Sequence, residues 1–129
     1  MKIERQRKIA LAVWDNIIAP VFDSTRTVLI AEIQDGKVMA SRREALGPEL
    51  PYSRAVKLSE WGIQVLICGG ISIGFARTIE VYGIEVIPFI SGEAQQVLEA
   101  YLNGTLTTDV FCMPGFRGGR RNRFRGGRR

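Results

Sequence analysis

Three short apolar segments, each closed by polar residues or glycine, constrain the fold of this chain more than any other feature. They span residues 8–14, 63–68 and 84–90. Continuous apolar runs of this length, bounded by turn residues, are typical of strands buried on both faces of a sheet. Such strands belong to α/β domains, in which helices cover the sheet. No apolar run approaches the ~18 residues that a membrane span needs, so we expect no membrane partner.

The segments between these runs complete an α/β pattern. Residues 27–33 are rich in β-branched side chains and end at Asp35-Gly36, a pair typical of a two-residue hairpin turn. Residues 37–43 are more polar and are expected to return antiparallel as an edge strand, whereas residues 15–26 are predicted as a loop. Helical spacing of apolar side chains predicts helices over residues 51–61, 71–82 and 93–102.

The resulting order is β-β-β-α-β-α-β-α. We therefore predict an α/β fold with a ribonuclease H-like, five-stranded mixed sheet and helices on both faces. Open sheets of this kind bind ligands outside the C-terminal ends of their parallel strands. In this chain that edge gathers Asp15-Asn16, Cys68-Gly69-Gly70 and Ser91-Gly92.

The positive charge of the chain is concentrated at its C-terminus. The formal net charge is +5, but residues 115–129 hold seven arginines and no acid, so the rest carries −2. This end contains two near copies of FRGGRR. Low-complexity sequence of this kind buries little, which predicts disorder. We expect an N-terminal extension at 1–7, one domain at 8–112 and a disordered basic tail at 113–129.

The chain has no histidine, and this restricts its chemistry. The absence excludes Ser-His-Asp and Cys-His catalysis and any histidine-ligated zinc site. Cys68 and Cys112 form no CxxC pair, and we expect both to be reduced. Residues 1–8 are charged and lead into no signal-like apolar region, so a cytoplasmic location is expected. The carboxylates are too scattered to predict the metal cluster of a ribonuclease H-like nuclease.

The strongest candidate site is the segment Cys68-Gly69-Gly70-Ile71-Ser72 between a strand and a helix. Its glycines would let a ligand approach the backbone, and the free N–H groups of the helix start would favour an anion. An equally weighted interpretation is that the glycines allow a tight turn and Cys68 is a small core residue. The lysine of a P-loop is missing, so the segment is not a nucleotide-binding loop.

The body of the chain, over about residues 8–115, resembles the dinitrogenase iron–molybdenum cofactor biosynthesis family, which includes NifX-like proteins and the molybdenum–copper orange protein. The order and spacing of several motifs carry the resemblance. They are Lys8-Ile9-Ala10, Ala19-Pro20-Val21-Phe22-Asp23 with Arg26, Gly62 to Ser72, Gly83 to Pro88, Gly92-Glu93, Val97 to Gly104 and Met113-Pro114-Gly115.

The resemblance implies a ribonuclease H-like fold and a non-enzymatic protein that binds or carries an anionic metal–sulfur cluster. The cluster would contain molybdenum, iron or copper with sulfide, and the partners would be other cofactor-assembly proteins. We expect the anion beside Gly69, Gly70, Ile71 and Ser72. The other expected site residues are Asn16, Arg26 and Ser91 as flanking groups, with Cys68 and then Cys112 as metal ligands.

Two other functions stay open at this point. RGG-type segments combine arginine charge with aromatic rings that stack on bases, so the FRGGRR tail predicts weak nucleic-acid or polyanion binding. The tail is equally well explained as a solubilising extension. The third possibility is a scaffold or regulator whose pocket stays empty.

Overall fold

A computed structural model describes residues 6–106 of the chain. It contains an open mixed sheet and three helices, which confirms the α/β fold class. The ribonuclease H-like classification and the domain boundaries stay predictions, and the basic tail lies outside the described residues. The elements are β1 (Gln6–Trp14), β2 (Ile17–Ile18), a 3₁₀ helix (Phe22–Ser24), β3 (Thr27–Gln34), β4 (Lys37–Ala45), α1 (Pro51–Glu60), β5 (Val65–Ile67), α2 (Ile73–Val81), β6 (Glu85–Ile87) and α3 (Ala94–Asn103).

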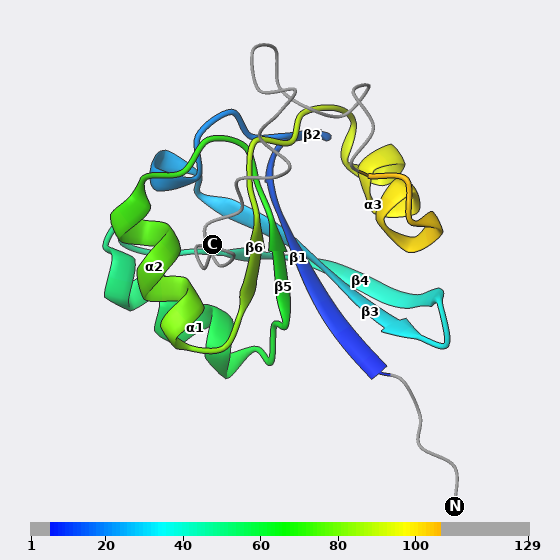
Figure 1. Ribbon diagram of the computed structural model, residues 1–129, viewed down its shortest axis with the longest axis horizontal. Coiled ribbons are helices and arrows are strands. Elements are labelled where there is room, and N and C mark those ends of the chain that lie inside the picture. Colours follow the sequence, from blue (N-terminus) through cyan, green and yellow to red (C-terminus); the bar gives the residue numbers. More distant parts are fainter. Residues whose placement is uncertain (1–5, 107–129) are drawn as a thin grey trace, which may run out of the picture.

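Strand β1 is the centre of the sheet, whose order is β4-β3-β1-β5-β6 (Figure 1). It pairs antiparallel with β3 and parallel with β5, so that Leu11 lies between Leu29 and Ile67. Strands β3 and β4 form the expected antiparallel hairpin, and β5 and β6 run parallel. The short β2 turns back on the end of β1.

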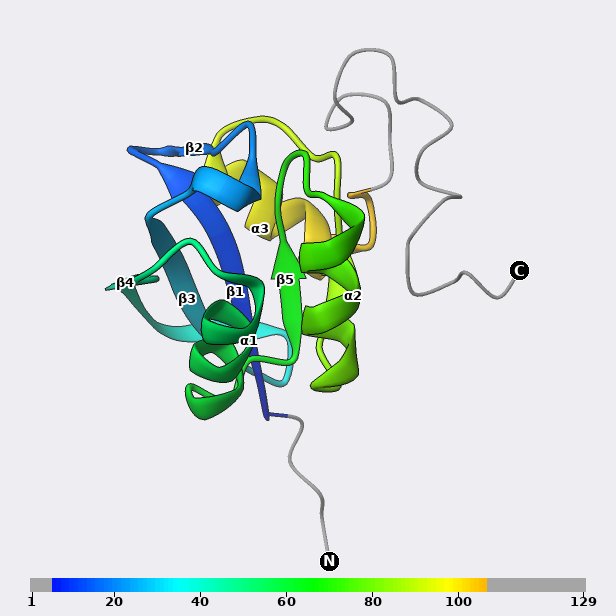
Figure 2. The same ribbon diagram turned by 90° about the vertical axis from the view of Figure 1, so that its left-hand side faces the viewer.

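Helices cover both faces of the sheet, with α1 and α2 on one side and α3 on the other (Figures 1 and 2). Ala10 and Ala12 of β1 belong to the core under α1 and α2, whereas Ile9, Leu11 and Val13 belong to the core under α3. Alternate residues of a strand point to opposite faces. Both faces of β1 are buried, which explains its continuous apolar sequence.

The ends of the helices and strands differ from the sequence-based expectations by a few residues. Helix α2 begins at Ile73 and not at residue 71, because the Ser72 side chain accepts a hydrogen bond from the Phe75 N–H and caps the helix. Helix α3 begins at Ala94 because Glu93 caps it in the same way. Strands β5 and β6 are shorter than the apolar runs that predicted them.

The expectation of an irregular loop over residues 15–26 was incomplete, because this segment contains β2 and the 3₁₀ helix. Both depend on hydrogen bonds to distant parts of the chain. The Ile18 N–H donates to the Gly92 carbonyl at 2.9 Å, and the Phe22 N–H donates to the Gly70 carbonyl at 2.7 Å. No local sequence pattern predicts hydrogen bonds between residues so far apart in the chain. The described residues include no helix whose length and apolar character would let it cross a membrane.

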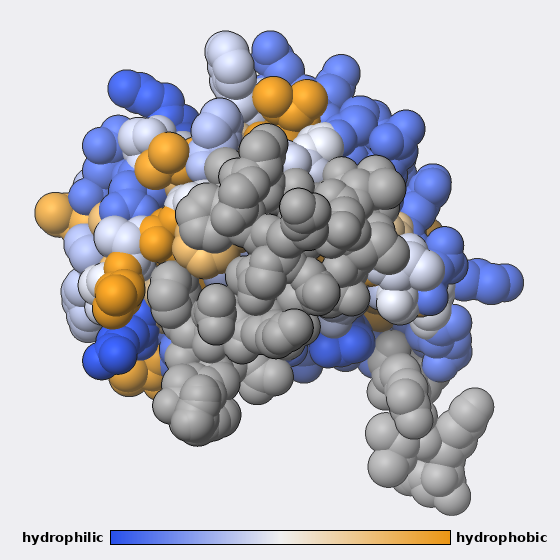
Figure 3. Space-filling model, turned by 45° about the horizontal axis from the view of Figure 1, so that its top comes forward, coloured by the Kyte–Doolittle hydropathy of each residue, from blue (hydrophilic) through white to orange (hydrophobic). Residues whose placement is uncertain are grey.

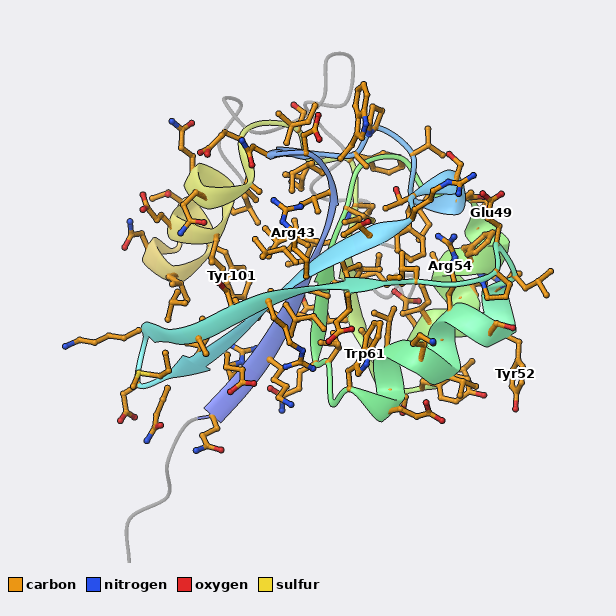
Figure 4. All side chains as sticks on the ribbon, turned by 180° about the vertical axis from the view of Figure 1, so that it is seen from behind. Arg43, Glu49, Tyr52, Arg54, Trp61 and Tyr101 are labelled. Carbon is orange, nitrogen blue, oxygen red and sulfur yellow. The ribbon has the colours of Figure 1, made fainter. Side chains whose placement is uncertain are left out.

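Arg54 of α1 is fully buried, and its hydrogen bonds connect α1 with residues 47–48 and with Phe22 (Figure 4). Its guanidinium donates to the carbonyls of Pro48 and Phe22 at 3.0 Å and of Gly47 at 3.4 Å. It also lies over the Phe22 ring, 5.5 Å from the centroid. Desolvation lowers the pKa of Arg54, while the carboxylate of Glu49 and then that of Asp23 raise it. A planar guanidinium group suits this role because it can donate hydrogen bonds to several carbonyls at once.

We expect Arg54→Lys to destabilise the protein by about 1–3 kcal/mol, because a single ammonium group leaves buried carbonyls without a donor. Urea unfolding followed by circular dichroism measures the change. The matched control is Arg77→Lys on the exposed face of α2, which should leave the midpoint unchanged. Equal midpoints for the two variants would show that the three carbonyl contacts contribute little.

Candidate functional site

The C-terminal ends of β1, β5 and β6 meet at one edge of the sheet, together with the starts of α2 and α3 (Figures 1 and 2). This is the edge at which the sequence predicted a site. The segment of residues 19–26, which follows β2, crosses this edge of the sheet and divides the edge into two parts. One part contains the glycine turn before α2, and the other contains an open cleft between the β1–β2 hairpin and the start of β3.

Cys68 lies in the core and not at the surface of this edge. Its side chain is fully buried in the cluster under α1 and α2. Burial raises the pKa of the Cys68 thiol, and the nearby Asp23 carboxylate raises the same pKa further. The thiol is therefore protonated at neutral pH, whereas metal ligation requires the thiolate. Cys112, the other expected ligand, lies outside the described residues.

Gly69 and Gly70 bring two backbone segments into direct contact. A Cβ atom on Gly69 would lie 2.5 Å from the carbonyl oxygens of Ala19 and Pro20, which no side chain tolerates. The Gly70 N–H donates to the Pro20 carbonyl at 2.7 Å. The structural interpretation is therefore supported for Gly69, which lets the 19–26 segment pack on the turn, whereas a Cβ atom on Gly70 would lie 3.4 Å from the Pro20 carbonyl oxygen.

The start of α2 already has an anionic partner from the same chain. The Ser72 N–H donates to Oδ1 of Asp23 at 3.0 Å. A carboxylate at a helix N-terminus is favoured by the helix dipole and the free N–H groups. Ile71, next to Ser72, is buried. The expected anion position at residues 69–72 is thus occupied by Asp23 in this conformation.

Asn16 and Arg26 line a cleft of about 950 Å³ on the other side of the 19–26 segment, whereas Ser91 does not. Ser91 lies half-buried in the connection between β6 and α3. The structure therefore brings together two of the expected site residues and separates them from the glycine turn. The residues that line the cleft are Val13, Trp14, Asp15, Asn16, Ala19, Pro20, Val21, Ser24, Thr25, Arg26, Thr27 and Arg43.

Arg43 is a charged cleft residue that the sequence analysis missed. It lies on β4 opposite Leu29 of β3, and its guanidinium points toward the loops at the top of the view in Figure 4. Its Nη2 donates to Oδ1 of Asn16 at 3.5 Å. The neighbouring Arg42 points to the other face, where it pairs with Glu32 and Glu44. The sequence did contain a signal for Arg43. Adjacent residues of a strand face opposite sides of the sheet, so the Arg42-Arg43 pair places one arginine on each face.

The cleft has an excess of positive charge. Within residues 6–106, neither Arg26 nor Arg43 forms an ion pair with a carboxylate, and both are exposed. Asp15 is the acidic side chain on the cleft wall, so two arginines and one aspartate give a formal charge of +1. Among the described residues, no three cysteine, aspartate or glutamate side chains come together to hold a metal ion. The cleft is therefore suited to an anion and not to a bare cation.

The family comparison fits this arrangement of helices and strands. The model of the family described as dinitrogenase iron-molybdenum cofactor matches residues 5–104. The chain belongs to this family. The match covers every helix and strand of the described structure, and the cleft residues all lie within it. No curated protein matches the chain.

Solved structures of other proteins share the fold of this chain. The crystal structure of PH0822 superposes with a TM-score of 0.71 at 17% identity, over 75% of this chain and 91% of that one. The apo form of the orange protein from Desulfovibrio gigas gives a TM-score of 0.65 at 19% identity. It covers 77% of this chain and 89% of the orange protein. At such identities the likeness establishes the fold alone.

We expect Cys68 to resist alkylation in the native protein, because its thiol is buried and its pKa is raised. Iodoacetamide labelling at about pH 8, read by peptide mass spectrometry, distinguishes Cys68 from Cys112. Labelling of Cys68 should appear only when denaturant unfolds the chain. Rapid labelling without denaturant would show that Cys68 reaches the surface, as a metal ligand would require.

We expect Gly69→Ala to destabilise the protein by about 1–3 kcal/mol, since the new methyl group meets rigid backbone oxygens. Gly74→Ala in α2 is the matched control, because a Cβ atom there has no neighbour within 4 Å. Its stability should be unchanged or slightly higher, as for other helical glycines. Denaturant midpoints for both variants test the contact, and a Gly69→Ala midpoint equal to that of the control would contradict it.

Proposed function

We propose that this chain binds an anionic metal–sulfur cluster in the cleft of Asn16, Arg26 and Arg43. In this proposal it acts as a non-enzymatic carrier or store during cofactor assembly. The family is named for the iron–molybdenum cofactor, which supports a cargo of this class. The cluster is cargo: it contains molybdenum, iron or copper with sulfide and passes to other assembly proteins.

The observation that carries the proposal is the pair of arginines in one open cleft, whose positive charge Asp15 balances only in part. Arg43 contacts the Asn16 side chain, and Arg26, which directly precedes β3, lines the same cleft. Guanidinium groups donate strong hydrogen bonds to anions, and they stay charged at every physiological pH. Two such groups without a carboxylate partner bind an anion more strongly than the paired Arg42 can.

The cleft can hold such a cargo without a protein thiolate. A thiometallate already carries its own sulfide ligands, so the protein has to supply positive charge, hydrogen-bond donors and apolar contacts. The indole of Trp14 and the side chain of Val21 offer an apolar wall for polarizable sulfur. Cys68 takes no part in this arrangement, because its side chain is buried in the core.

The glycine turn with Ile71, Ser72 and Ser91 remains the alternative position for the cluster. An anion there would have to displace the Asp23 carboxylate from the Ser72 N–H. It would also compete with the hydrogen bond between Gly70 and Pro20. Both costs favour the cleft. Polyanion binding by the FRGGRR tail stays a separate prediction, since the tail lies outside the described residues.

We expect Arg43→Gln to weaken uptake of tetrathiomolybdate with copper(I) by about tenfold, the loss that corresponds to one charged hydrogen bond. Visible absorption and elemental analysis of the reconstituted protein measure the uptake. Arg42→Gln is the matched control, because this adjacent arginine of β4 faces away from the cleft. It should take up the cluster as the unmodified protein does.

The same measurement on Gly70→Val and Cys68→Ser distinguishes the two positions of the cluster. Binding in the cleft predicts that both variants, provided they fold, retain the absorption spectrum. Loss of the cluster in these variants, together with normal uptake by Arg43→Gln, would place the site at the turn and overturn our assignment.

A further inference from the structure

An exposed aromatic ring lines the same cleft as the two arginines. Trp14 is the last residue of β1, and it is 64% exposed. Its indole shares the cleft with the guanidinium groups of Arg26 and Arg43. Where the described residues are visible in Figure 3, apolar side chains lie among polar ones at this end of the molecule. The cleft therefore offers one ligand both a flat apolar ring and two cations.

The hairpin that carries Trp14 is held in place by backbone hydrogen bonds. The Ala94 N–H donates to the Asn16 carbonyl at 2.7 Å, and the Ile18 N–H donates to the Gly92 carbonyl at 2.9 Å. Both bonds connect the hairpin to the start of α3. The strand that carries the indole is thus preorganised, so a ligand that stacks on the ring orders little additional backbone.

The cleft is much larger than a simple thiometallate. Its volume of about 950 Å³ lies at the upper end of the range for small-molecule sites, about 300–1,000 Å³. A tetrahedral anion of one metal atom and four sulfides fills only a small part of this space. The cleft therefore has room for a ligand that combines an extended ring system with an anionic group.

We infer that the cleft binds a nucleoside monophosphate, with its base stacked on Trp14 and its phosphate held by Arg26 and Arg43. Nucleobases stack on aromatic side chains, and this stacking contributes substantially to affinity. Guanidinium groups donate strong, often bidentate hydrogen bonds to phosphate. The inference goes beyond the proposed function, because it needs no metal and gives the indole ring a ligand of its own.

The charge of the cleft favours a single phosphate group over a chain of phosphates. Arg26 and Arg43 against Asp15 give a formal charge of +1. A phosphomonoester carries a charge of about −1.5 to −2 at neutral pH. Asp15 repels additional negative charge, so a longer series of phosphates gains little in the cleft. The FRGGRR tail has the charge density that suits a polymer, and the cleft suits a mononucleotide.

A fluorescence titration of the full-length, metal-free protein with adenosine monophosphate (AMP) tests the inference. The chain has two tryptophans, and Trp61 is half-buried and does not line the cleft. We expect AMP to quench the emission of Trp14. Adenosine lacks the phosphate and inorganic phosphate lacks the base, so each should bind about tenfold more weakly than AMP.

Variants of the cleft assign the two halves of the ligand. Trp14→Leu should weaken AMP binding about tenfold in equilibrium dialysis, because it keeps an apolar side chain and removes the stacking ring. Trp14→Phe should recover part of this loss. Arg43→Gln should weaken binding about tenfold. The matched control is Arg42→Gln, which should bind AMP normally because Arg42 pairs with Glu32 and Glu44 on the other face.

Several outcomes would overturn the inference. Equal AMP affinities for Trp14→Leu and the unmodified protein would show that the base does not stack on Trp14. Equal affinities for Arg43→Gln and Arg42→Gln would place the phosphate outside the cleft, since both variants keep the arginine-rich tail. If AMP leaves the emission unchanged while a short oligoadenylate quenches it, the ligand is single-stranded nucleic acid and the mononucleotide is wrong.

The proposed function is tested separately from the nucleotide site. The AMP titrations contain no metal, so a failure to bind AMP leaves the metal–sulfur cluster proposal standing. A failure to take up tetrathiomolybdate with copper(I) leaves the nucleotide site standing in the same way, because base stacking on Trp14 does not depend on the cluster.

Discussion

The contact between the backbone of residues 20–22 and that of Gly69-Gly70 organises the whole functional edge of this protein. Two hydrogen bonds of 2.7 Å join the segments, and Gly69 allows the carbonyl oxygens of Ala19 and Pro20 to approach. The contact fixes the 3₁₀ helix, which in turn places Phe22 under Arg54 and Asp23 at the start of α2. A glycine is required because any side chain would separate the two backbones.

The same contact determines which polar groups remain free for a ligand. The 19–26 segment accepts hydrogen bonds from the N–H groups of Gly70 and Ser72, so these two donors of the glycine turn already have partners within the chain. On its other side the segment forms one wall of the cleft and leaves Arg26 exposed. We therefore place the proposed anion site at the side chains of the cleft and not at the turn.

Strand alternation gives the two arginines of β4 different environments. Arg42 meets Glu32 and Glu44 on the side of α1, and exposed pairs of this kind contribute little to stability. Arg43 points to the opposite face and meets the amide of Asn16. Within residues 6–106, Arg43 forms no ion pair with a carboxylate, and a guanidinium group in that state is well suited to hold an anion. The proposed cargo site depends on this asymmetry.

The sequence by itself determined the three helices, the strands other than β2 and their order, because apolar periodicity is a local property of each segment. It also predicted Asn16 and Arg26 as neighbouring residues at one edge of the sheet, and both line the same cleft. Only the tertiary structure decided that Cys68 is buried, that Asp23 occupies the start of α2 and that Arg43 faces the cleft. These three facts depend on contacts between residues distant in the chain, and the backbone packing that creates them has no local pattern in the sequence.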